Sequence, residues 1–319
     1  MYGRWSRDGG VLKASLEAKG CRVDLQYSDY SSADQIQDLE KLVSKGCKAL
    51  IVAPVDNYAL GQVLAEAKRR GIRVLSYDRL IMDTPAVDCM VAFDDLKIGI
   101  LQGQYIVRQL GLDRGKGPFN IELFAGSPEN PDASVYFSGA MSALRPYIES
   151  GRLLVRSGQK DFAAVATQRW ESQFAEARML DLEHEYYGKT SRLDAVLAPN
   201  DDIAMGILGA LESAGYGKPG RPRPWLTGQD CDLAAVQAVM AGRLSMSVFK
   251  DCRDEARSAA DLTYDLLMDR QPKFNDTTTY NNGSKVVPTR ICQSVAVVDA
   301  SNYRHLLVDS GYYKESELQ

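Results

Sequence analysis

The chain has 319 residues, of which 45% are hydrophobic and 25% are charged. This length suffices for about two domains, and the composition predicts a soluble globular protein rather than a disordered one. The net charge of −4 and the pI near 5.4 argue against broad electrostatic binding to nucleic acid. No run approaches the roughly 20 apolar residues that a membrane-spanning helix needs.

Short apolar runs alternate with amphipathic stretches from near the amino end to about residue 250. Each run is followed by polar residues, glycine or proline, which is typical of strands. The predicted strands are Arg22–Tyr27, Ala49–Ala53, Arg73–Tyr77, Met90–Phe93, Asn120–Phe124, Leu153–Val155, Ala195–Leu197, Trp225–Thr227 and Met246–Phe249. Three helices between strands should stop at Gly20, Gly46 and Gly71, each after a basic last turn. The alternation predicts an α/β fold with parallel sheets covered by helices on both faces.

Polar residues follow nearly every predicted strand. They are Asp56 and Asn57; Asp78 and Arg79; Asp94 and Asp95; residues 126–132; residues 200–202; Gln229 and Asp230; and Lys250 and Asp251. A doubly wound sheet binds ligands outside the carboxyl ends of its strands. Asp and Asn also cap helices at this position, and Asp95 and Asp202 are interpreted as caps. Seven polar strand ends, with Arg79 and Lys250 among them, nevertheless predict a hydrogen-bonding pocket.

Catalytic and metal-binding motifs are not apparent in the sequence. The six cysteines form no C-x-x-C pair, and the only histidines, His184 and His305, stand far apart. No G-x-G-x-x-G follows a strand, and the segment 111–116 (GLDRGK) misses the phosphate-loop spacing by one residue. Glu122 lies inside a predicted strand and would make a poor catalytic acid. We therefore expect no enzyme, no cofactor and no metal.

Several strings occur together in order along the chain. They are YDRL (77–80), FDDLKIG (93–99), GKGPFNIELFAGSPEN (115–130), SGQ (157–159), RW (169–170), TGQD (227–230), VFKD (248–251), KVVPT (285–289) and DSGYY (309–313). From about Gly3 to the carboxyl end, the chain resembles the type I periplasmic sugar-binding proteins of ABC transporters. Within them it resembles the multiple-monosaccharide-binding (ChvE-like) branch.

The resemblance implies two Rossmann-like lobes with parallel sheets and a sugar cleft between them. The N-terminal lobe is expected to contain residues 1–118 and 250–284, and the C-terminal lobe residues 119–249 and 285–319. It also implies a monomeric protein outside the cytoplasm that captures an aldopentose or aldohexose by hinge closure. The sugar passes to an ABC permease, and in some relatives the closed form also signals to a membrane sensor or chemoreceptor.

The ligand-binding residues that the resemblance implies are Arg4, Trp5, Asp78, Arg79, Asp132, Trp170, Asn200, Asp201, Asp230 and Lys250. A pyranose needs ionised acceptors paired with fixed donors, and an aromatic face for its C–H patch. The four aspartates would accept, the arginines, the lysine and Asn200 would donate, and the two tryptophans would stack. Other interpretations stay open: the tryptophans could belong to the core, Asp201 could cap a helix, and Arg79 and Lys250 could form structural ion pairs.

Two departures from the family pattern stand out. Asp132 replaces an asparagine that binds sugar in relatives, so an amide donor is lost. The family's first strand, which lies inside the sheet beside Arg22–Tyr27, has no counterpart in the sequence. We expect that the sequence is an N-terminally truncated reading of a longer gene, with Met1 an internal start.

The alternative function is the inducer-binding domain of a LacI-type regulator, although no basic helix-turn-helix precedes the fold.

Overall fold

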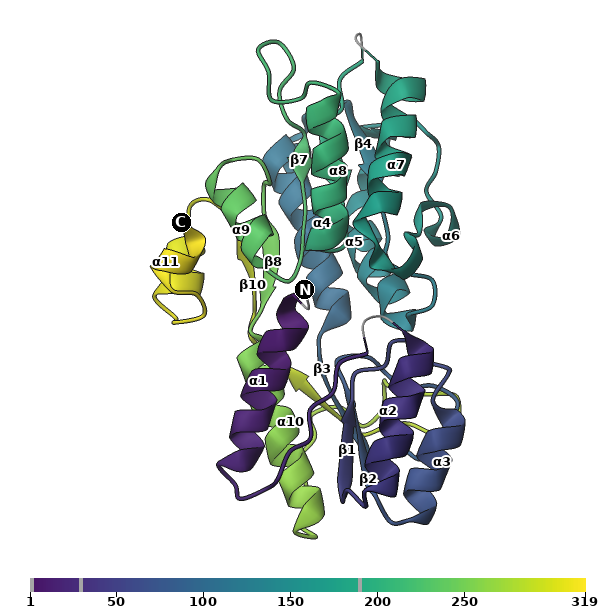
Figure 1. Cartoon of the computed structure of the whole chain (residues 1–319). Coiled ribbons are helices and arrows are strands. Elements are labelled where there is room, and N and C mark those ends of the chain that lie inside the picture. Colours follow the sequence, from purple (N-terminus) through teal and green to yellow (C-terminus); the bar gives the residue numbers. More distant parts are fainter. Residues whose placement is uncertain (1–2, 29–30, 189–190) are drawn as a thin grey trace. The chain divides into compact units, whose positions relative to one another are not determined.

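The computed structural model describes residues 3–28, 31–188 and 191–319, and it divides the chain into two compact units. Unit 1 contains Met1–Asp94 and Asp251–Ser294, and unit 2 contains Asp95–Lys250 and Val295–Gln319. The chain crosses from one unit to the other three times (Figure 1). Three boundaries differ from the expected ones. Residues 95–118 belong to unit 2, because α4 (Asp95–Leu110) packs along α5 (Pro131–Glu149), and residues 285–294 belong to unit 1, because β9 (Thr289–Cys292) pairs with β3 (Cys89–Phe93). Lys250 belongs to unit 2, where β8 (Ser247–Lys250) pairs with β10 (Val295–Val298).

Unit 1 is built on one parallel sheet with the strand order β1-β2-β3-β9. These strands are β1 (Ala49–Val52), β2 (Arg73–Tyr77), β3 (Cys89–Phe93) and β9 (Thr289–Cys292). Its helices are α1 (Gly3–Glu17), α2 (Ser32–Ser44), α3 (Gly61–Arg69) and α10 (Cys252–Leu267). The helices α2 and α3 bury their apolar sides against β1–β3, while α10 contacts all four strands and packs along α1. Helices therefore cover both faces of the sheet, as the alternation predicts.

The predicted strand Arg22–Tyr27 is wrong. The segment carries the burial alternation of an extended chain, with Val23 and Leu25 half-buried and Arg22, Asp24 and Gln26 exposed. It has no ladder partner among the described residues, because β1 pairs with β2 alone. Strand periodicity in the sequence cannot form a strand where no neighbouring backbone lies within hydrogen-bonding distance.

Unit 2 contains a second parallel sheet, with the order β5-β4-β6-β7, and an antiparallel pair of β8 and β10. The strands are β4 (Phe119–Leu123), β5 (Leu153–Val155), β6 (Ala195–Leu197), β7 (Trp225–Leu226), β8 (Ser247–Lys250) and β10 (Val295–Val298). The α-helices are α4 (Asp95–Leu110), α5 (Pro131–Glu149), α6 (Phe162–Val165), α7 (Ser172–Leu182), α8 (Asp201–Ser213), α9 (Leu233–Met240) and α11 (Glu315–Leu318). Two apolar clusters form its core, one with α7 and α8 and the other with α4 and α5.

The predicted helix stops are confirmed. Gly20, Gly46 and Gly71 have φ angles of 83°, 76° and 72°, in the left-handed region that a residue without Cβ adopts at low cost. In the described part of the chain, no helix is long and apolar enough to cross a membrane. The six cysteines are all free thiols.

Candidate functional site

Arg4 lies at the centre of a buried cluster of charges in unit 1. It belongs to the first turn of α1, and the residue is 7% exposed. Its Nη2 donates to Asp78 Oδ1 at 3.1 Å and to Glu255 Oε2 at 2.8 Å. Its Nε donates to Asp8 Oδ2 at 3.3 Å. One guanidinium thus holds three carboxylates at fixed positions, and carboxylate oxygens are strong acceptors for hydroxyl groups.

Asp78 and Arg79 follow β2 directly, at the carboxyl end of the sheet. The φ angle of Asp78 is 62°, a left-handed conformation that few residues other than glycine adopt. The Asp78 amide donates to Val91 O at 2.9 Å, and Arg79 Nη1 donates to Pro54 O at 3.3 Å. Backbone strain of this kind persists where the surroundings fix it and is common at ligand sites.

Trp5 is half-buried and lies close to two cations. The Cζ atom of Arg4 is 4.8 Å from the centroid of its ring, and that of Arg79 is 5.4 Å away. Both distances are within the range of cation–π attraction. The ring belongs to the polar cluster of unit 1, and it is absent from the unit's apolar core cluster.

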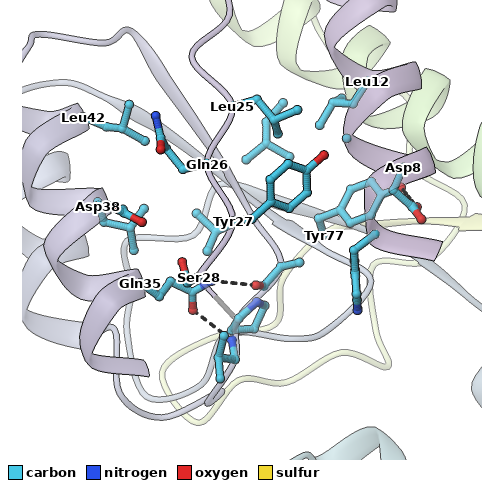
Figure 2. A pocket seen from close by; sticks show the side chains of 18 of the residues that line it. Asp8, Leu12, Leu25, Gln26, Tyr27, Ser28, Gln35, Asp38, Leu42 and Tyr77 are labelled. Atoms are coloured by element: carbon cyan, nitrogen blue, oxygen red, sulfur yellow. Dashed lines mark hydrogen bonds between the residues drawn. The ribbon is translucent and has the colours of Figure 1, made fainter. Parts of the chain in front are cut away.

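Asp8 completes the cluster and was not predicted. Burial raises its pKa, while the Arg4 charge and a hydrogen bond from Tyr77 Oη oppose that shift. Figure 2 shows Asp8 beside Tyr77. Burial and the Asp8 charge raise the pKa of Tyr77, so that its phenol stays a donor. The spacing of Arg4 and Asp8, one helical turn apart, was a signal from which Asp8 could have been found.

Unit 2 holds its own buried ion pair. Lys250, at the end of β8, is 3% exposed, and its Nζ lies 3.0 Å from Asp230 Oδ1. The same Nζ is 5.8 Å from the centroid of the Tyr136 ring. Asp230 has a φ angle of 99°, so that a second candidate ligand residue adopts a left-handed backbone. The pair supplies an acceptor and a donor whose geometry is fixed by burial.

Trp170 is held by polar and aromatic contacts next to this pair. Its Nε1 donates to Asn130 Oδ1 at 2.7 Å, and its ring packs edge-on against Tyr136 with centroids 6.5 Å apart. The six-membered ring covers Gly126 so closely that an added Cβ there would lie 2.0 Å from it. Gly126 is therefore required by the position of the indole. Lys250, Tyr136 and Trp170 consequently form one continuous set of side chains.

Asn200, and not Asp201, caps the following helix. Asn200 is the N-cap of α8, and its Oδ1 accepts from the Ile203 amide at 3.1 Å. Asp201 is 1% exposed, and its two oxygens accept from Ser247 Oγ at 2.8 Å and from the Asp232 amide at 2.9 Å. Burial raises the pKa of Asp201 well above its usual range. Its carboxyl group is thus part of the interior of unit 2, whereas Asn200 keeps its amide group as a potential donor.

Asp132 lies in the first turn of α5, directly after Pro131, and is half-buried. Of the candidate residues, the structure gathers Arg4, Trp5, Asp78 and Arg79 in unit 1. In unit 2 it gathers Trp170, Asp230 and Lys250. Sequence reasoning missed Asp8 and Glu255 in unit 1 and Tyr136 in unit 2, whereas Asn130 lies in the segment 126–132 that the strand-end rule selects. Glu255 follows β8 by five residues, too far along α10 for a search limited to strand ends.

Comparisons with known proteins agree with this architecture. A model of the periplasmic binding protein domain matches residues 4–271. The chain belongs to this family.

Two curated relatives cover nearly the whole chain. The multiple sugar-binding periplasmic protein SbpA of Azospirillum brasilense is 45% identical over 99% of this chain and 88% of its own length. The multiple sugar-binding periplasmic receptor ChvE of Rhizobium radiobacter is 44% identical over 99% of this chain and 89% of its own length. The fold also matches a solute-binding protein of an ABC transporter from Clostridium phytofermentans with bound β-D-glucose. That match has a TM-score of 0.94 and 41% identity, and it covers 99% of this chain and 96% of the other.

The family is one of binding proteins, and the side chains of both sets suit that role. The described residues contain no group of three or more His, Cys, Asp or Glu side chains arranged to hold a metal ion. Unit 1 combines three buried carboxylates with a fixed cation and an aromatic ring, and unit 2 combines one carboxylate with a fixed cation and an aromatic ring. This is the chemistry that a polyhydroxylated ring requires.

Proposed function

We propose that this protein is the extracytoplasmic solute-binding component of an ABC importer and that it captures one monosaccharide, an aldopentose or an aldohexose. The observation that carries the proposal is the Arg4 cluster, because a buried guanidinium surrounded by three carboxylates offers donors and acceptors at fixed positions. The relatives, which are named as multiple sugar-binding periplasmic proteins, support the same ligand class.

Each unit would bind one part of the sugar. In unit 1, Arg4 and Arg79 donate to hydroxyl oxygens, Asp78 accepts from hydroxyl groups, and Trp5 covers C–H groups. In unit 2, Lys250 and the Asn200 amide donate, Asp230 and Asp132 accept, and Trp170 stacks. A sugar hydroxyl both donates and accepts, so that neighbouring acceptors and donors can both be satisfied by one ring. Asp201 has no place in this ligand set, since its oxygens are used inside unit 2.

Capture would proceed by hinge closure around the sugar, which shifts the population of the protein to a closed form. Charge-assisted hydrogen bonds become stronger when water leaves the site, and closure therefore adds affinity. The closed complex would deliver the sugar to the permease. We also propose that the free protein is a monomer. A membrane sensor or chemoreceptor would bind the same closed form.

A thermal-shift panel tests the ligand class. The purified protein is heated with D-glucose, D-galactose, D-xylose, L-arabinose or D-ribose, and with mannitol and sucrose as controls. A ligand at about 100 times its Kd stabilises the folded state by about 2.7 kcal/mol, which is a rise of several degrees in Tm. At least one aldose is expected to raise Tm in a concentration-dependent way. The proposal fails if no aldose at 10 mM shifts the transition.

A further inference from the structure

Two consecutive residues of unit 2 adopt a left-handed backbone at the end of the string TGQD (227–230). The φ angles of Asp230 and Cys231 are 99° and 51°. Residues other than glycine adopt this region rarely, and such strain persists only where the surroundings fix it. We call residues 230–232 the Asp230 loop. The segments packed around this loop should therefore contain the groups that hold it.

The first two amides of the Asp230 loop donate to β8. The Asp230 amide donates to Val248 O at 2.9 Å, which is a backbone contact. The Cys231 amide donates to the side chain of Ser247, with a distance of 3.0 Å to Oγ. A hydroxyl group thus takes the place of a backbone carbonyl where the loop leaves the strand geometry.

Asp201 connects the Asp230 loop to the start of α8. Its Oδ2 accepts from the Asp232 amide at 2.9 Å, and its Oδ1 accepts from Ser247 Oγ at 2.8 Å. The carboxylate lies so close to Gly228 that an added Cβ there would collide with Oδ1. This buried carboxylate consequently holds the loop at one amide directly and at the Cys231 amide through Ser247.

Tyr313 binds the carbonyl group of the same loop from the C-terminal segment. Its Oη donates to Cys231 O at 2.9 Å, although the two residues stand 82 positions apart. Tyr313 is 6% exposed, and its amide donates to Leu307 O at 2.8 Å. Its ring packs edge-on against Tyr312, with centroids 5.1 Å apart. The hydroxyl group therefore reaches the loop from a fixed position.

The C-terminal segment is itself held against β8 and α9. The strand β10 pairs with β8, and α11 contacts α9 (Figure 1). Between them, the Tyr312 ring packs edge-on against Phe249 of β8, with centroids 4.7 Å apart. The string DSGYY (309–313) thus has a defined place in unit 2, where it brings the Tyr313 hydroxyl to the Asp230 loop.

The position of the Asp230 carboxylate depends on this loop. Its Oδ1 lies 3.0 Å from Lys250 Nζ. An aspartate side chain is short, so its carboxylate follows any displacement of its backbone. A hydrogen-bonding group that is held in place before binding loses less freedom on binding, and the contacts behind it set that place.

We propose that Asp201 and Tyr313 are positioning residues for Asp230. They fix the backbone of the Asp230 loop and so hold the Asp230 carboxylate beside Lys250, without binding the sugar themselves. The inference rests on the proposed function, in which Asp230 accepts a hydrogen bond from a sugar hydroxyl.

Tyr313→Phe tests the role of Tyr313, because it removes one hydroxyl group and keeps the ring. The Kd for D-glucose, measured by isothermal titration calorimetry, is expected to rise about tenfold. In the absence of sugar, the amide hydrogens of residues 230–232 should exchange at least about tenfold faster, as followed by mass spectrometry.

Tyr216→Phe is the matched control. It removes the hydroxyl group of another buried tyrosine of unit 2, which donates to Glu183 Oε2 at 3.0 Å and has no contact with the Asp230 loop. The control should lower Tm by an amount similar to that of Tyr313→Phe. Its Kd for D-glucose and the exchange at residues 230–232 should equal those of the unmodified protein.

A second pair of variants tests the role of Asp201. Asp201→Ala leaves the Asp232 amide and the Ser247 hydroxyl without their acceptor, and the Kd for D-glucose should rise at least about tenfold. Asp201→Asn keeps one acceptor and gains a donor that Ser247 Oγ can accept, so it should restore most of the affinity. If Asp201→Ala does not fold, Ser247→Ala replaces it, since it removes the group between Asp201 and the Cys231 amide.

The inference is overturned if Tyr313→Phe changes neither the Kd nor the exchange at residues 230–232, or only one of them. Equal weakening of D-glucose binding by Tyr216→Phe would also overturn it, because the loss would then follow from stability alone. An unchanged Kd for Asp201→Ala would remove Asp201 from the positioning residues. If the unmodified protein binds no aldose, the proposed function itself fails, and the exchange rates still show whether Tyr313 fixes the loop.

Discussion

Both units place a buried cation next to carboxylates, but the number of carboxylates per cation differs between them. In unit 1 one guanidinium, that of Arg4, contacts three carboxylates that come from α1, α10 and the end of β2. In unit 2 one ammonium, that of Lys250, pairs with the carboxylate of Asp230, four residues after the end of β7. Removing the cation therefore leaves more uncompensated buried charge in unit 1 than in unit 2. Folding of unit 1 is therefore expected to depend more strongly on Arg4 than folding of unit 2 depends on Lys250.

The largest effect is expected for Arg4→Met. Loss of the guanidinium leaves Asp8, Asp78 and Glu255 buried without their shared donor, which should cost about 3–5 kcal/mol of unfolding free energy. Binding of D-glucose should disappear as well. Urea unfolding and isothermal titration calorimetry measure the two effects. Arg4→Lys keeps the positive charge but loses the planar guanidinium with its several donors, so its stability and affinity should lie between those of Arg4→Met and the unmodified protein. An Arg4→Met protein of unchanged stability would contradict the proposed role of Arg4 in folding.

Lys250→Met should weaken sugar binding more than it weakens folding. The variant leaves one carboxylate, at 13% side-chain exposure, so that its unfolding free energy should fall by about 1–3 kcal/mol. Affinity for D-glucose should drop about 100-fold, which corresponds to about 2.7 kcal/mol. The same two measurements apply, with Lys250→Arg as the charge-preserving control. A larger loss of stability for Lys250→Met than for Arg4→Met would reverse the proposed difference between the units.

The stability of unit 2 is expected to depend on pH through the buried carboxyl group of Asp201. Burial raises the pKa of Asp201 above its unfolded value of about 3.9, so the folded state binds more protons between the two values. This contribution to stability is complete below about pH 3.9 and is lost as the pH rises through the folded pKa. Asp201→Asn removes the titration and should gain stability relative to the unmodified protein between pH 4.5 and pH 7. Urea unfolding at both pH values detects the change.

Asp113→Asn is the matched control, because this aspartate of the same unit has a side chain that is 48% exposed. The change in unfolding free energy of Asp113→Asn between pH 4.5 and pH 7 should equal that of the unmodified protein. If the unfolding free energy of Asp201→Asn also changes with pH as that of the unmodified protein does, the pKa of Asp201 is the same in the folded and the unfolded state.

The smallest effect is expected for Asp132→Asn. A carboxylate only accepts hydrogen bonds, whereas an amide also donates, so the substitution should change the order of preference among aldoses. The ratio of the affinities for D-glucose and D-xylose should shift at least about threefold while unfolding free energy stays within about 0.5 kcal/mol. Competition titrations with both sugars measure the ratio. An unchanged ratio would remove Asp132 from the ligand set.

Most of the fold was predictable because its signals are local. Eight of the nine predicted strands overlap observed ones, since a short apolar run followed by polar residues is sufficient where a neighbouring strand exists. Arg22–Tyr27 has the right period but no partner. The strands β9 and β10 were missed because they lie outside the strand–helix alternation, which ends near residue 250, although Val295–Val298 is itself a short β-branched run. Among the candidate residues, the strand-end rule selected Asp78, Arg79, Asp230 and Lys250, and the structure places them in the polar sets of the two units. Their role as ligands stays a prediction.

The sequence by itself determined the α/β architecture, the helix stops and the residue types available at the strand ends. Only the tertiary structure decided that Asn200 caps α8 while Asp201 is buried, and that Asp8 and Glu255 share Arg4 with Asp78. The physical reason is that hydrophobic period and turn chemistry act over a few residues. Burial and hydrogen-bond partnership depend on which segments meet, and Arg4 and Glu255 stand 251 positions apart.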